Sequence, residues 1–317
     1  MKTLEISVII PAYKAADFLE KAVLSAVTFS EVKEIIIIED GSPDATLSVA
    51  QSLAKKYPKV VVYQHPDQKN HGDSASRNLG IEKTKYSYIA FLDADDYFLP
   101  NRFDAEKELF KHQKIDAVFG ATGTEFLTEE GEKLYMEKFK NDGLCTVHFA
   151  AEGKEIFHRL VEEQNTFGAS FSMIALTMKR SALENPKIRM TETLKIGMDK
   201  EFIIKMAYHK HMKTGLIDQP ISVRTAHGDN TITKIKTYSK SFFEHDAKLY
   251  KSLYLWAKSE KNFPKEEKQI FKSKYLASEI ASETGITKYL KYLYYLPSTP
   301  RLLKTRYRYF ALKNNPE

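Results

Sequence analysis

The sequence lacks several features that would point to particular classes of protein. It has one cysteine, Cys145, in 317 residues, so it cannot close an internal disulfide or build a zinc site from clustered cysteines, and we expect a reducing compartment. It has no run of about 18 apolar residues, which excludes a membrane-spanning helix. Its N-terminal apolar run is too short for a signal peptide, so we expect a buried strand there. These absences predict a cytoplasmic location, either free or peripheral on the inner face of the cell membrane.

The sequence has only a small excess of positive over negative charge. Lys and Arg number 48 against 42 Asp and Glu, which gives a formal net charge of +6. This surplus is compatible with anionic ligands or an anionic membrane surface, but it does not indicate nucleic acid binding. With 43% hydrophobic and 28% charged residues, the composition is that of a folded globular chain. The length suits one large domain with an appendage, or two modest domains.

Short apolar runs alternate with amphipathic stretches between residues 5 and 97. The apolar runs that we expect to be strands are 6–10, 34–38, 59–63 and 88–92. Because these runs are apolar on both faces and helical patterns separate them, they predict an α/β fold with a parallel sheet covered on both sides. Ligands of such sheets gather beyond the carboxyl ends of the strands. Polar clusters follow three of the runs, at 11–13, 39–42 and 93–96.

The pattern after residue 97 is less regular. The remaining segments that we expect to be regular are strands within 115–150, interrupted by loops near 129–131 and 141–143, a buried strand at 171–178, a helix after Asp199 and a strand at 221–224. Helical periodicity dominates from residue 238 onward. We therefore place a boundary between an α/β domain, 1–237, and a helical C-terminal region, 238–317.

Asp93 and Asp95 are the most informative pair of acidic residues. Residues i and i+2 of an extended backbone point the same way, so both carboxylates face one side and Ala94 faces the other. Neighbouring carboxylates repel each other unless a cation or hydrogen bonds compensate them, and oxygen ligands of this kind suit Mg²⁺ or Mn²⁺. The alternative is an acidic turn that caps the helix expected near Leu99.

A second acidic element, Glu39-Asp40-Gly41-Ser42, follows the second predicted strand. Asp40 at the strand end is placed to accept hydrogen bonds from a nucleobase imide or a ribose hydroxyl. Gly41 permits a tight turn, and Ser42 suits the cap of the next helix. The alternative is that Asp40 only stabilises this turn.

Four segments in this order resemble the family 2 glycosyltransferases, which are inverting enzymes of the GT-A fold. The segments are SVIIPAY at 7–13, EDGS at 39–42, SRNLG at 76–80 and FLDADD at 91–96. The resemblance is specific through residues 5–100, extends to about residue 230 and is absent beyond. It implies a mixed nucleotide-binding sheet flanked by helices and transfer of a hexose or N-acetylhexosamine from a nucleoside diphosphate sugar, a UDP-sugar in particular. The acceptor it implies is a glycan or a lipid-linked molecule in surface polysaccharide or glycolipid synthesis.

The resemblance also implies roles for individual residues. The residues that would hold the donor nucleotide and ribose are Pro11, Ala12, Tyr13, Asp40, Arg77, Asp93 and Ala94. Asp95 would bind the Mn²⁺ or Mg²⁺ ion. The sequence departs from the family pattern at Glu39, where Asp is usual, and at Ser76, where Ala is usual.

The catalytic base in this family lies in a Glu-Asp pair that opens a helix. Asp199 matches the second residue of that pair, while Met198 replaces the first. The alternative role for Asp199 is to cap an amphipathic helix, and Glu201 is the nearest rival as base. Met198 also keeps open the alternative that the protein is a catalytically inactive relative that binds a nucleotide sugar or acts as a scaffold.

His227 stands in RTAH, residues 224–227, which resembles a Tyr-Arg-x-His element near the end of such domains. The resemblance implies that His227 binds the metal or the donor diphosphate. The alternative is a surface histidine in a polar loop. The remaining histidines, His65, His71, His209 and His211 among them, have no comparable context and are expected to be structural or exposed.

The segment 288–313 combines tyrosines and leucines with seven basic residues and contains no acid. Those basic residues are Lys288, Lys291, Arg301, Lys304, Arg306, Arg308 and Lys313. Helices of this composition lie in bilayer interfaces, because aromatic rings favour the headgroup zone and cations favour anionic lipid. The alternative is a basic helix packed on the catalytic domain. We predict a peripheral interaction with an anionic membrane.

Two other enzyme classes fit the sequence less well. A sugar-nucleotide pyrophosphorylase would carry a glycine-rich phosphate loop after its first strand, where Pro11, Ala12, Tyr13 and Lys14 stand instead. A dinucleotide dehydrogenase would carry a GxGxxG motif after a strand, and none is present.

Overall fold

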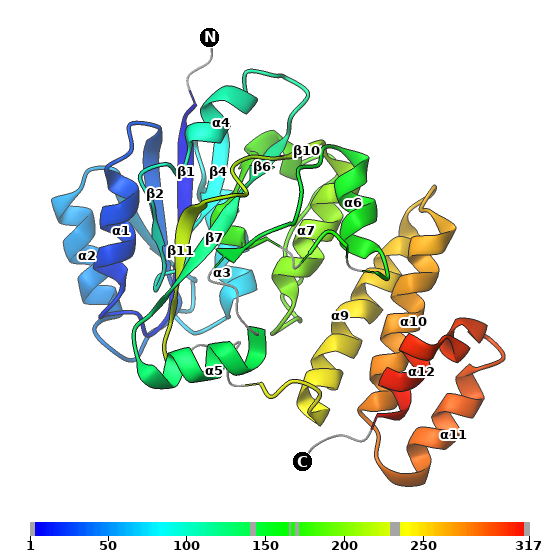
Figure 1. Ribbon diagram of the computed structural model, residues 1–317. Helices are drawn as coiled ribbons and strands as arrows, with labels where there is room; N and C mark the ends of the chain where they lie inside the picture. Colours follow the sequence, from blue (N-terminus) through cyan, green and yellow to red (C-terminus); the bar gives the residue numbers. More distant parts are fainter. Residues whose placement is uncertain (1–3, 140–143, 165, 169–170, 229–234, 314–317) are drawn as a thin grey trace.

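A computed structural model describes residues 4–139, 144–164, 166–168, 171–228 and 235–313, and shows a mixed α/β body with a group of helices at one end (Figure 1). The main sheet has seven strands in the order β10-β6-β9-β4-β1-β2-β3. Its parallel part consists of β1 (Ile6–Ala12), β2 (Val32–Glu39), β3 (Val60–Gln64) and β4 (Tyr88–Phe91). The four N-terminal strands predicted from the apolar runs are therefore confirmed.

The other strands make the main sheet mixed and build a small second sheet. β6 (Ala117–Phe119) and β4 flank β9 (Leu176–Lys179) in antiparallel register, and β10 (Met212–Thr214) pairs with β6. The second sheet has the order β5-β11-β7-β8. Its strands are β5 (Tyr97–Phe98), β7 (Ala121–Phe126), β8 (Leu144–Cys145) and β11 (Pro220–Ala226). The strand predicted at 171–178 begins late, since a short 3₁₀ turn, Met173–Ala175, precedes β9.

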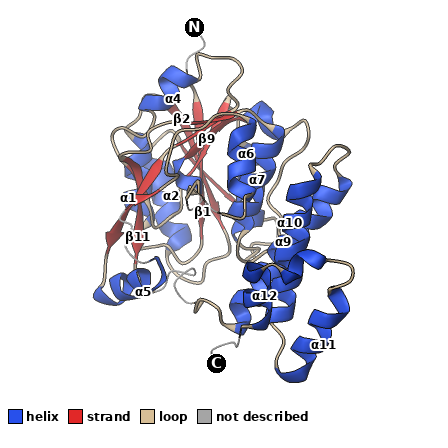
Figure 2. Cartoon of the chain, turned by 45° about the vertical axis from the view of Figure 1, so that its right-hand side comes forward, coloured by secondary structure: helices blue, strands red, loops and turns tan. Residues whose placement is uncertain are grey.

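Helices cover both faces of the main sheet, which explains why its strands are apolar throughout. Along β1, Val8 and Ile10 face one core with α1 (Leu19–Val27) and α2 (Thr46–Lys56), while Ile9 faces the other. This alternation is the two-residue period of a pleated strand. On the second face lie α6 (Lys154–Val161) and α7 (Met198–His209) (Figure 2), and α3 (Asp73–Lys83) contributes Ile81 to the same core. Short α4 (Asp104–Leu109) follows β5 along the chain.

Residues 129–139 form helix α5 (Glu129–Phe139), although we expected a loop near 129–131 between strands. The first turn carries Glu129, Glu130 and Glu132, and acidic side chains there stabilise a helix through its dipole. The Thr128 hydroxyl accepts a 3.0 Å hydrogen bond from the Gly131 N–H. Local capping thus outweighs the glycine that suggested a turn. The loop expected at 141–143 lies outside the described residues.

The C-terminal region is helical, as predicted. It contains α9 (Lys240–Ser259), α10 (Lys265–Ala281), α11 (Gly285–Tyr295), the 3₁₀ turn η3 (Pro300–Leu303) and α12 (Thr305–Leu312). Leu253 of α9 and Phe271 of α10 belong to the same hydrophobic core as Phe91 and Phe119 of the main sheet. A separate small core, including Tyr292, Leu302 and Tyr307, begins at the end of α10. The main core therefore continues across the boundary at 237/238, and that division stays a prediction.

Among the described residues, no helix is both long and apolar enough to cross a membrane.

Candidate active site

The ends of β1, β2 and β4 bring the predicted nucleotide-binding residues to one edge of the main sheet. β2, β1 and β4 are neighbours in the sheet, with Ala12 in register with Glu39 and Ile9 with Phe91. Pro11 and Ala12 are buried at the end of β1, whereas Tyr13 is 43% exposed. Parallel strands end at the same edge of a sheet, so segments far apart in the sequence meet there.

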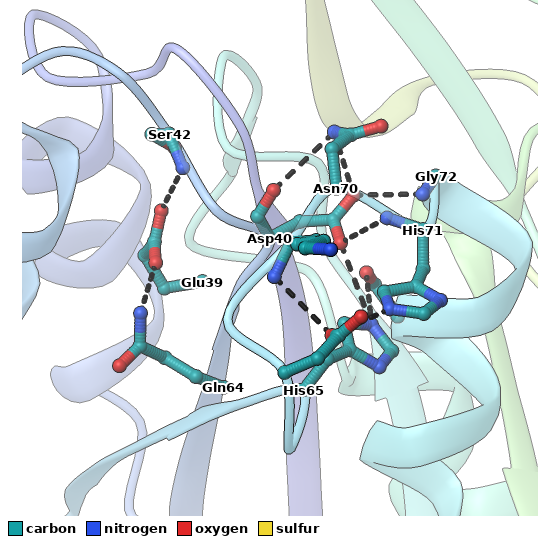
Figure 3. A network of polar contacts seen from close by, with 11 residues as sticks. Glu39, Asp40, Ser42, Gln64, His65, Asn70, His71 and Gly72 are labelled. Carbon is teal, nitrogen blue, oxygen red and sulfur yellow. Dashed lines mark hydrogen bonds and ion pairs between the residues drawn. The ribbon is translucent and has the colours of Figure 1, made fainter.

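Asp40 connects this edge to the loop that leads into α3 (Figure 3). Its carboxylate accepts hydrogen bonds from Asn70 Nδ2 at 2.9 Å, from the His71 N–H at 2.8 Å and from the Gly72 N–H at 2.8 Å. His65 Nε2 lies 3.4 Å from the same carboxylate, and the Asp40 side chain is only 3% exposed. The carboxylate of Asp40 therefore holds the 70–72 loop in place, a role that the sequence did not reveal.

Two glycines allow these segments to approach each other closely. Gly41 has a φ of +67°, and a Cβ there would lie 2.8 Å from the backbone oxygen of Gln68. Gly80 of α3 packs against β1 so tightly that a Cβ would lie 2.3 Å from the Ile9 side chain. Since side chains cannot occupy such positions, glycine at 41 lets the 68–70 segment approach the end of β2, and glycine at 80 sets the distance between α3 and β1.

Arg77 of α3 lies between two of the predicted functional carboxylates. Its Nη2 donates a 2.6 Å hydrogen bond to Oδ1 of Asp93, and its Nη1 lies 3.6 Å from Oδ1 of Asp199. Burial opposes the charge of Arg77, but Asp93, Asp199 and Asp73 together raise its pKa. Within the described chain, Nε and Nη1 of Arg77 and Oδ1 of Asp199 have no hydrogen-bond partner. An anionic ligand would satisfy the N–H groups of Arg77, and a hydroxyl donor would satisfy Oδ1 of Asp199.

The segment after β4 places three aspartates in different environments. Asp93 faces Arg77, and both Asp93 and Asp95 are about one-third exposed. Asp96 is buried and accepts a 2.9 Å hydrogen bond from the Thr225 N–H, which ties this segment to β11. Burial, followed by the nearby charges of Asp95 and Asp93, raises the pKa of Asp96 well above its usual range. The segment therefore carries closely spaced acids that a cation would relieve. Ala94, between them, is buried.

Asp95 and His227 form the candidate metal site. Nε2 of His227 lies 3.3 Å from Oδ2 of Asp95, and its ring stacks on Phe18 with centroids 5.0 Å apart. Adjacent ligands of an octahedral ion with bonds of ~2.1 Å lie about 3 Å apart, so the pair fits Mg²⁺ or Mn²⁺. In the part of the chain that the structure describes, no group of three or more such side chains is placed to hold a metal. The remaining ligands would therefore be phosphate oxygens and water, as is usual for Mg²⁺.

Asp199 lies in the first turn of α7, as predicted, and Glu201 points elsewhere. Glu201 is completely buried, lies 3.0 Å from Lys205 Nζ and accepts a short hydrogen bond from the Ser252 hydroxyl of α9. The Asp199 side chain is 45% exposed and lies beside Arg77. The two carboxylates thus face different surroundings, and only Asp199 adjoins the residues collected at the sheet edge.

The pKa of Asp199 reflects several opposing influences. Desolvation raises it, Arg77 lowers it, and the charges of Asp93 and Asp73 raise it further. Because nearly half of the side chain is exposed, water screens these effects more than at the enclosed Asp96. Asp199 therefore remains an accessible carboxylate whose pKa lies above its ordinary value.

Two further contacts define this region without having been expected from the sequence. Arg224 Nη2 donates a 3.1 Å hydrogen bond to the Ser172 hydroxyl. Burial lowers the pKa of Arg224, but nearby groups, of which Cys145 and Asp96 have the largest effect, raise it above its ordinary value. Lys200, which follows Asp199, donates a 2.9 Å hydrogen bond to the Tyr250 hydroxyl of α9. Long-range contacts of this kind leave no local pattern in the sequence.

The comparisons with known proteins agree with this architecture. The chain matches the family model described as Glycosyl transferase family 2 over residues 7–180, more than half of its length. It is 28% identical over 251 residues to GgaB, a minor teichoic acid biosynthesis protein of Bacillus subtilis, covering 76% of this chain and 25% of GgaB. It is 28% identical over 308 residues to an uncharacterised glycosyltransferase of Rickettsia conorii, covering 90% of this chain and 47% of that protein. The chain thus spans a quarter to a half of the length of these relatives.

The solved structures that it resembles share its fold at low sequence identity. Staphylococcus aureus TarS 1-349, in complex with UDP-GlcNAc, superposes with a TM-score of 0.64 at 16% identity, covering 96% of this chain and 83% of that one. The mannosyltransferase PcManGT from Pyrobaculum calidifontis, in complex with GDP-Man and Mn²⁺, has a TM-score of 0.54 at 14% identity and covers 97% and 83%. The chain has the GT-A fold and belongs to glycosyl transferase family 2.

Proposed function

We propose that the protein transfers a sugar from a nucleoside diphosphate sugar to an acceptor hydroxyl, with inversion at the anomeric carbon and with Mn²⁺ or Mg²⁺ bound. The observation that carries this proposal is the position of Arg77 between Asp93 and Asp199, with buried N–H groups that have no partner in the described chain. Arg77 joins the edge where the nucleotide would bind to the carboxylate that would activate the acceptor. A diphosphate would accept hydrogen bonds from these N–H groups.

The donor would lie along the carboxyl ends of β1, β2 and β4. Pro11, Ala12 and Tyr13 would form the surface under the base, and the exposed Tyr13 ring is available for stacking. Asp40 would support this surface indirectly, because its buried carboxylate holds the 70–72 loop in place. Asp93 and the backbone at Ala94 would contact the ribose and orient Arg77.

Asp95 and His227 would hold the metal ion. When bound, the ion would neutralise the charge that develops on the departing diphosphate. Asp95 is suited to this role because its side chain is partly exposed and faces His227. Arg77 would stabilise the same diphosphate from the other side without a change in its own protonation.

Asp199 would act as general base. Its carboxylate would take the proton of the acceptor hydroxyl while the acceptor oxygen attacks the anomeric carbon, and the nucleoside diphosphate would leave with the electrons of the broken bond. One new glycosidic bond forms as the bond to the diphosphate breaks.

A UDP-sugar is the donor that the TarS structures support, since TarS 1-349 has been solved in complex with UDP-GlcNAc and in complex with UDP, whereas PcManGT has been solved with GDP-Man. The names of GgaB and of the putative teichuronic acid biosynthesis glycosyltransferase TuaG of Bacillus subtilis favour a surface polysaccharide pathway, with a glycan or lipid-linked acceptor. The transferred group would be a hexose or N-acetylhexosamine.

A donor screen tests the proposal. Thermal shift measurements with UDP, GDP, dTDP and their sugars, each with Mn²⁺ and with EDTA, should show one nucleotide that raises the melting temperature, because ligands stabilise the native state by mass action. Hydrolysis or transfer of the matching sugar should follow. Met198, in place of the usual Glu, motivates the alternative of an inactive nucleotide-sugar-binding relative, for which binding would occur without turnover. If no donor raised the melting temperature, both the transferase proposal and the inactive-relative alternative would be contradicted.

A further inference from the structure

Helix α11 turns an apolar face toward solvent. The exposed large hydrophobic side chains on this helix are Ile286 (74%), Tyr289 (52%), Leu290 (59%), Leu293 (62%) and Tyr294 (77%). Their spacing of three and four residues places them on one stripe that covers roughly 140° of the helix. The opposite side packs inward, with Lys288 and Tyr292 buried. The stripe is therefore a continuous surface and not a scatter of single exposed residues.

Two neighbouring side chains add to the apolar character of this end of the molecule. Leu303, at the end of η3, is 56% exposed and Tyr309 of α12 is 59% exposed. Figures 1 and 2 show α11 as the outermost helix, with α12 beside it and α9 and α10 between it and the sheet.

Most of the seven basic residues of 288–313 have partners within the chain. Lys288 donates a 2.6 Å hydrogen bond to the Lys313 carbonyl, and Lys291 pairs with Glu283 and Glu279. Arg301 lies 2.5 Å from Glu163 and 2.6 Å from Glu266, and Lys304 lies 3.4 Å from Glu163. Tyr307 also donates a 2.6 Å hydrogen bond to Glu163. These contacts attach η3 and the start of α12 to the segment after α6, so this part of the predicted membrane segment is packed on the catalytic domain.

The two remaining arginines are on α12, and the charge of Arg306 also acts on the nearby cations Lys200 and Lys274. Arg306 and Arg308 are exposed on α12, and in the described part of the chain neither has a carboxylate within 4 Å. Residues 284–313 contain no Asp or Glu at all. Lys313 lies over the rings of Tyr238 and Tyr309. The surroundings of the apolar stripe therefore favour an anionic partner.

We propose that the outward face of α11 inserts into the interface of an anionic lipid bilayer, with Ile286, Leu290 and Leu293 at the acyl boundary. Tyr289 and Tyr294 then lie at the depth of the headgroups, which suits rings with a polar tip, and the arginines of α12 face anionic phosphates. A second copy of the chain is a poorer occupant. An 11-residue helix presents a face roughly 16 Å by 10 Å, far below the ~800 Å² per partner of a stable dimer.

Vesicle co-sedimentation of the full chain tests this proposal. The probes are vesicles of equimolar phosphatidylglycerol and phosphatidylcholine, and vesicles of phosphatidylcholine alone. The test variant is the double substitution Leu290→Glu and Leu293→Glu on the stripe. The matched control is Leu255→Glu, since Leu255 of α9 is an exposed leucine (53%) away from the stripe. Melting temperatures of all variants establish that they are folded.

The wild type and Leu255→Glu should bind the anionic vesicles, and the double variant should lose binding at least about tenfold. Replacing Arg306 and Arg308 with Gln should weaken binding to the anionic vesicles and reduce its dependence on salt. Equal binding by the folded double variant and the wild type would overturn the proposal. The proposal would also be overturned if the wild type did not bind vesicles but formed a dimer in sedimentation and the double variant were monomeric. A second copy of the chain would then cover the stripe. Neither outcome depends on donor binding.

Discussion

Nη2 of Arg77 donates a 2.6 Å hydrogen bond to Oδ1 of Asp93, and this contact joins α3 to the segment that follows β4. The Arg77 side chain is only 4% exposed, so water cannot compensate its charge, and the neighbouring carboxylates do so instead. Its other terminal nitrogen faces Asp199 at 3.6 Å. One guanidinium group therefore contacts both Asp93 of the proposed donor site and Asp199, the proposed base. A substitution at either carboxylate should therefore also affect Arg77.

Exchange of Asp199 for Asn should separate catalysis from binding. The amide keeps the size of the side chain but cannot take the acceptor proton, so turnover should fall by about a hundredfold or more. Affinity for the nucleoside diphosphate should not fall, because Arg77 loses a competing carboxylate. Steady-state kinetics together with calorimetry of the nucleotide check this. Near-normal turnover of Asp199→Asn would show that another group is the base.

Glu201→Gln is the matched control on the same helix. Glu201 is enclosed between Lys205 and Ser252, so loss of its charge should lower the free energy of unfolding by about 1–3 kcal/mol. Turnover at a temperature where the variant is folded should stay within a few-fold of wild type. Denaturant unfolding and kinetics measure the two effects. A large loss of turnover without destabilisation would make Glu201 the better candidate.

The pH dependence of turnover should reflect the raised pKa of Asp199. Desolvation, assisted by Asp93 and Asp73 and opposed by Arg77, holds this pKa above its ordinary value of 3.8. A base must be ionised, so activity should decline as pH falls through the raised pKa, and the acidic limb of kcat should lie above the range of an ordinary aspartate. A limb at or below the ordinary value would contradict the role of Asp199.

The raised pKa of Asp199 should also make the free energy of unfolding depend on pH. The native state holds the Asp199 proton more tightly than the unfolded chain does, so stability from this residue is present at low pH and is lost as pH rises through the folded pKa. In Asp199→Asn this part of the pH dependence should disappear. Thermal unfolding of wild type and variant from acid to neutral pH would reveal it, and identical profiles would argue against the shift.

Asp95→Ala should remove the metal dependence of nucleotide binding. In the wild type, Mn²⁺ should tighten binding of the nucleoside diphosphate and EDTA should weaken it, because Asp95 and His227 supply two donors for the ion. In the variant, affinity should be low and equal in both conditions. Calorimetry measures this directly. If wild-type affinity were the same with Mn²⁺ and with EDTA, the metal assignment would be abandoned.

Asp40→Asn should disturb the 70–72 loop. The amide nitrogen would face a backbone N–H of His71 or Gly72 in place of an acceptor, and loss of such buried hydrogen bonds costs about 1–3 kcal/mol of the free energy of unfolding. Donor affinity should fall as well, because this loop leads to Arg77. Asp67→Asn is the control, since the Asp67 side chain is exposed and, among the described residues, contacts His71 and its own turn. Equal effects of the two substitutions would leave no special role for Asp40.

Residues at the carboxyl ends of the strands could be found from the sequence, because local patterns specify them. The continuous apolar runs predicted β1, β2, β3 and β4 and so the edge that carries residues 11–13, 39–42 and 93–96. The helix predicted after Asp199 is α7, but the extended backbone predicted for Asp93 and Asp95 is wrong. β4 ends at Phe91, and residues 93–96 form a turn that the Asp96 N–H closes by donating a 3.1 Å hydrogen bond to the Asp93 carbonyl. Each of these inferences depends only on neighbours in the chain.

The sequence by itself determined which elements form and where their polar ends lie, because strand and helix periodicity are properties of a few consecutive residues. Only the tertiary structure decided what each carboxylate contacts. Asp40 binds a loop thirty residues away, Glu201 is enclosed by α9, and Asp96 holds β11. The tertiary structure also decided that the apolar stripe of α11 faces solvent and that Arg301 and Lys304 pair with Glu163. These outcomes depend on which surfaces compete for burial when distant segments pack, and no local pattern of residues records that competition.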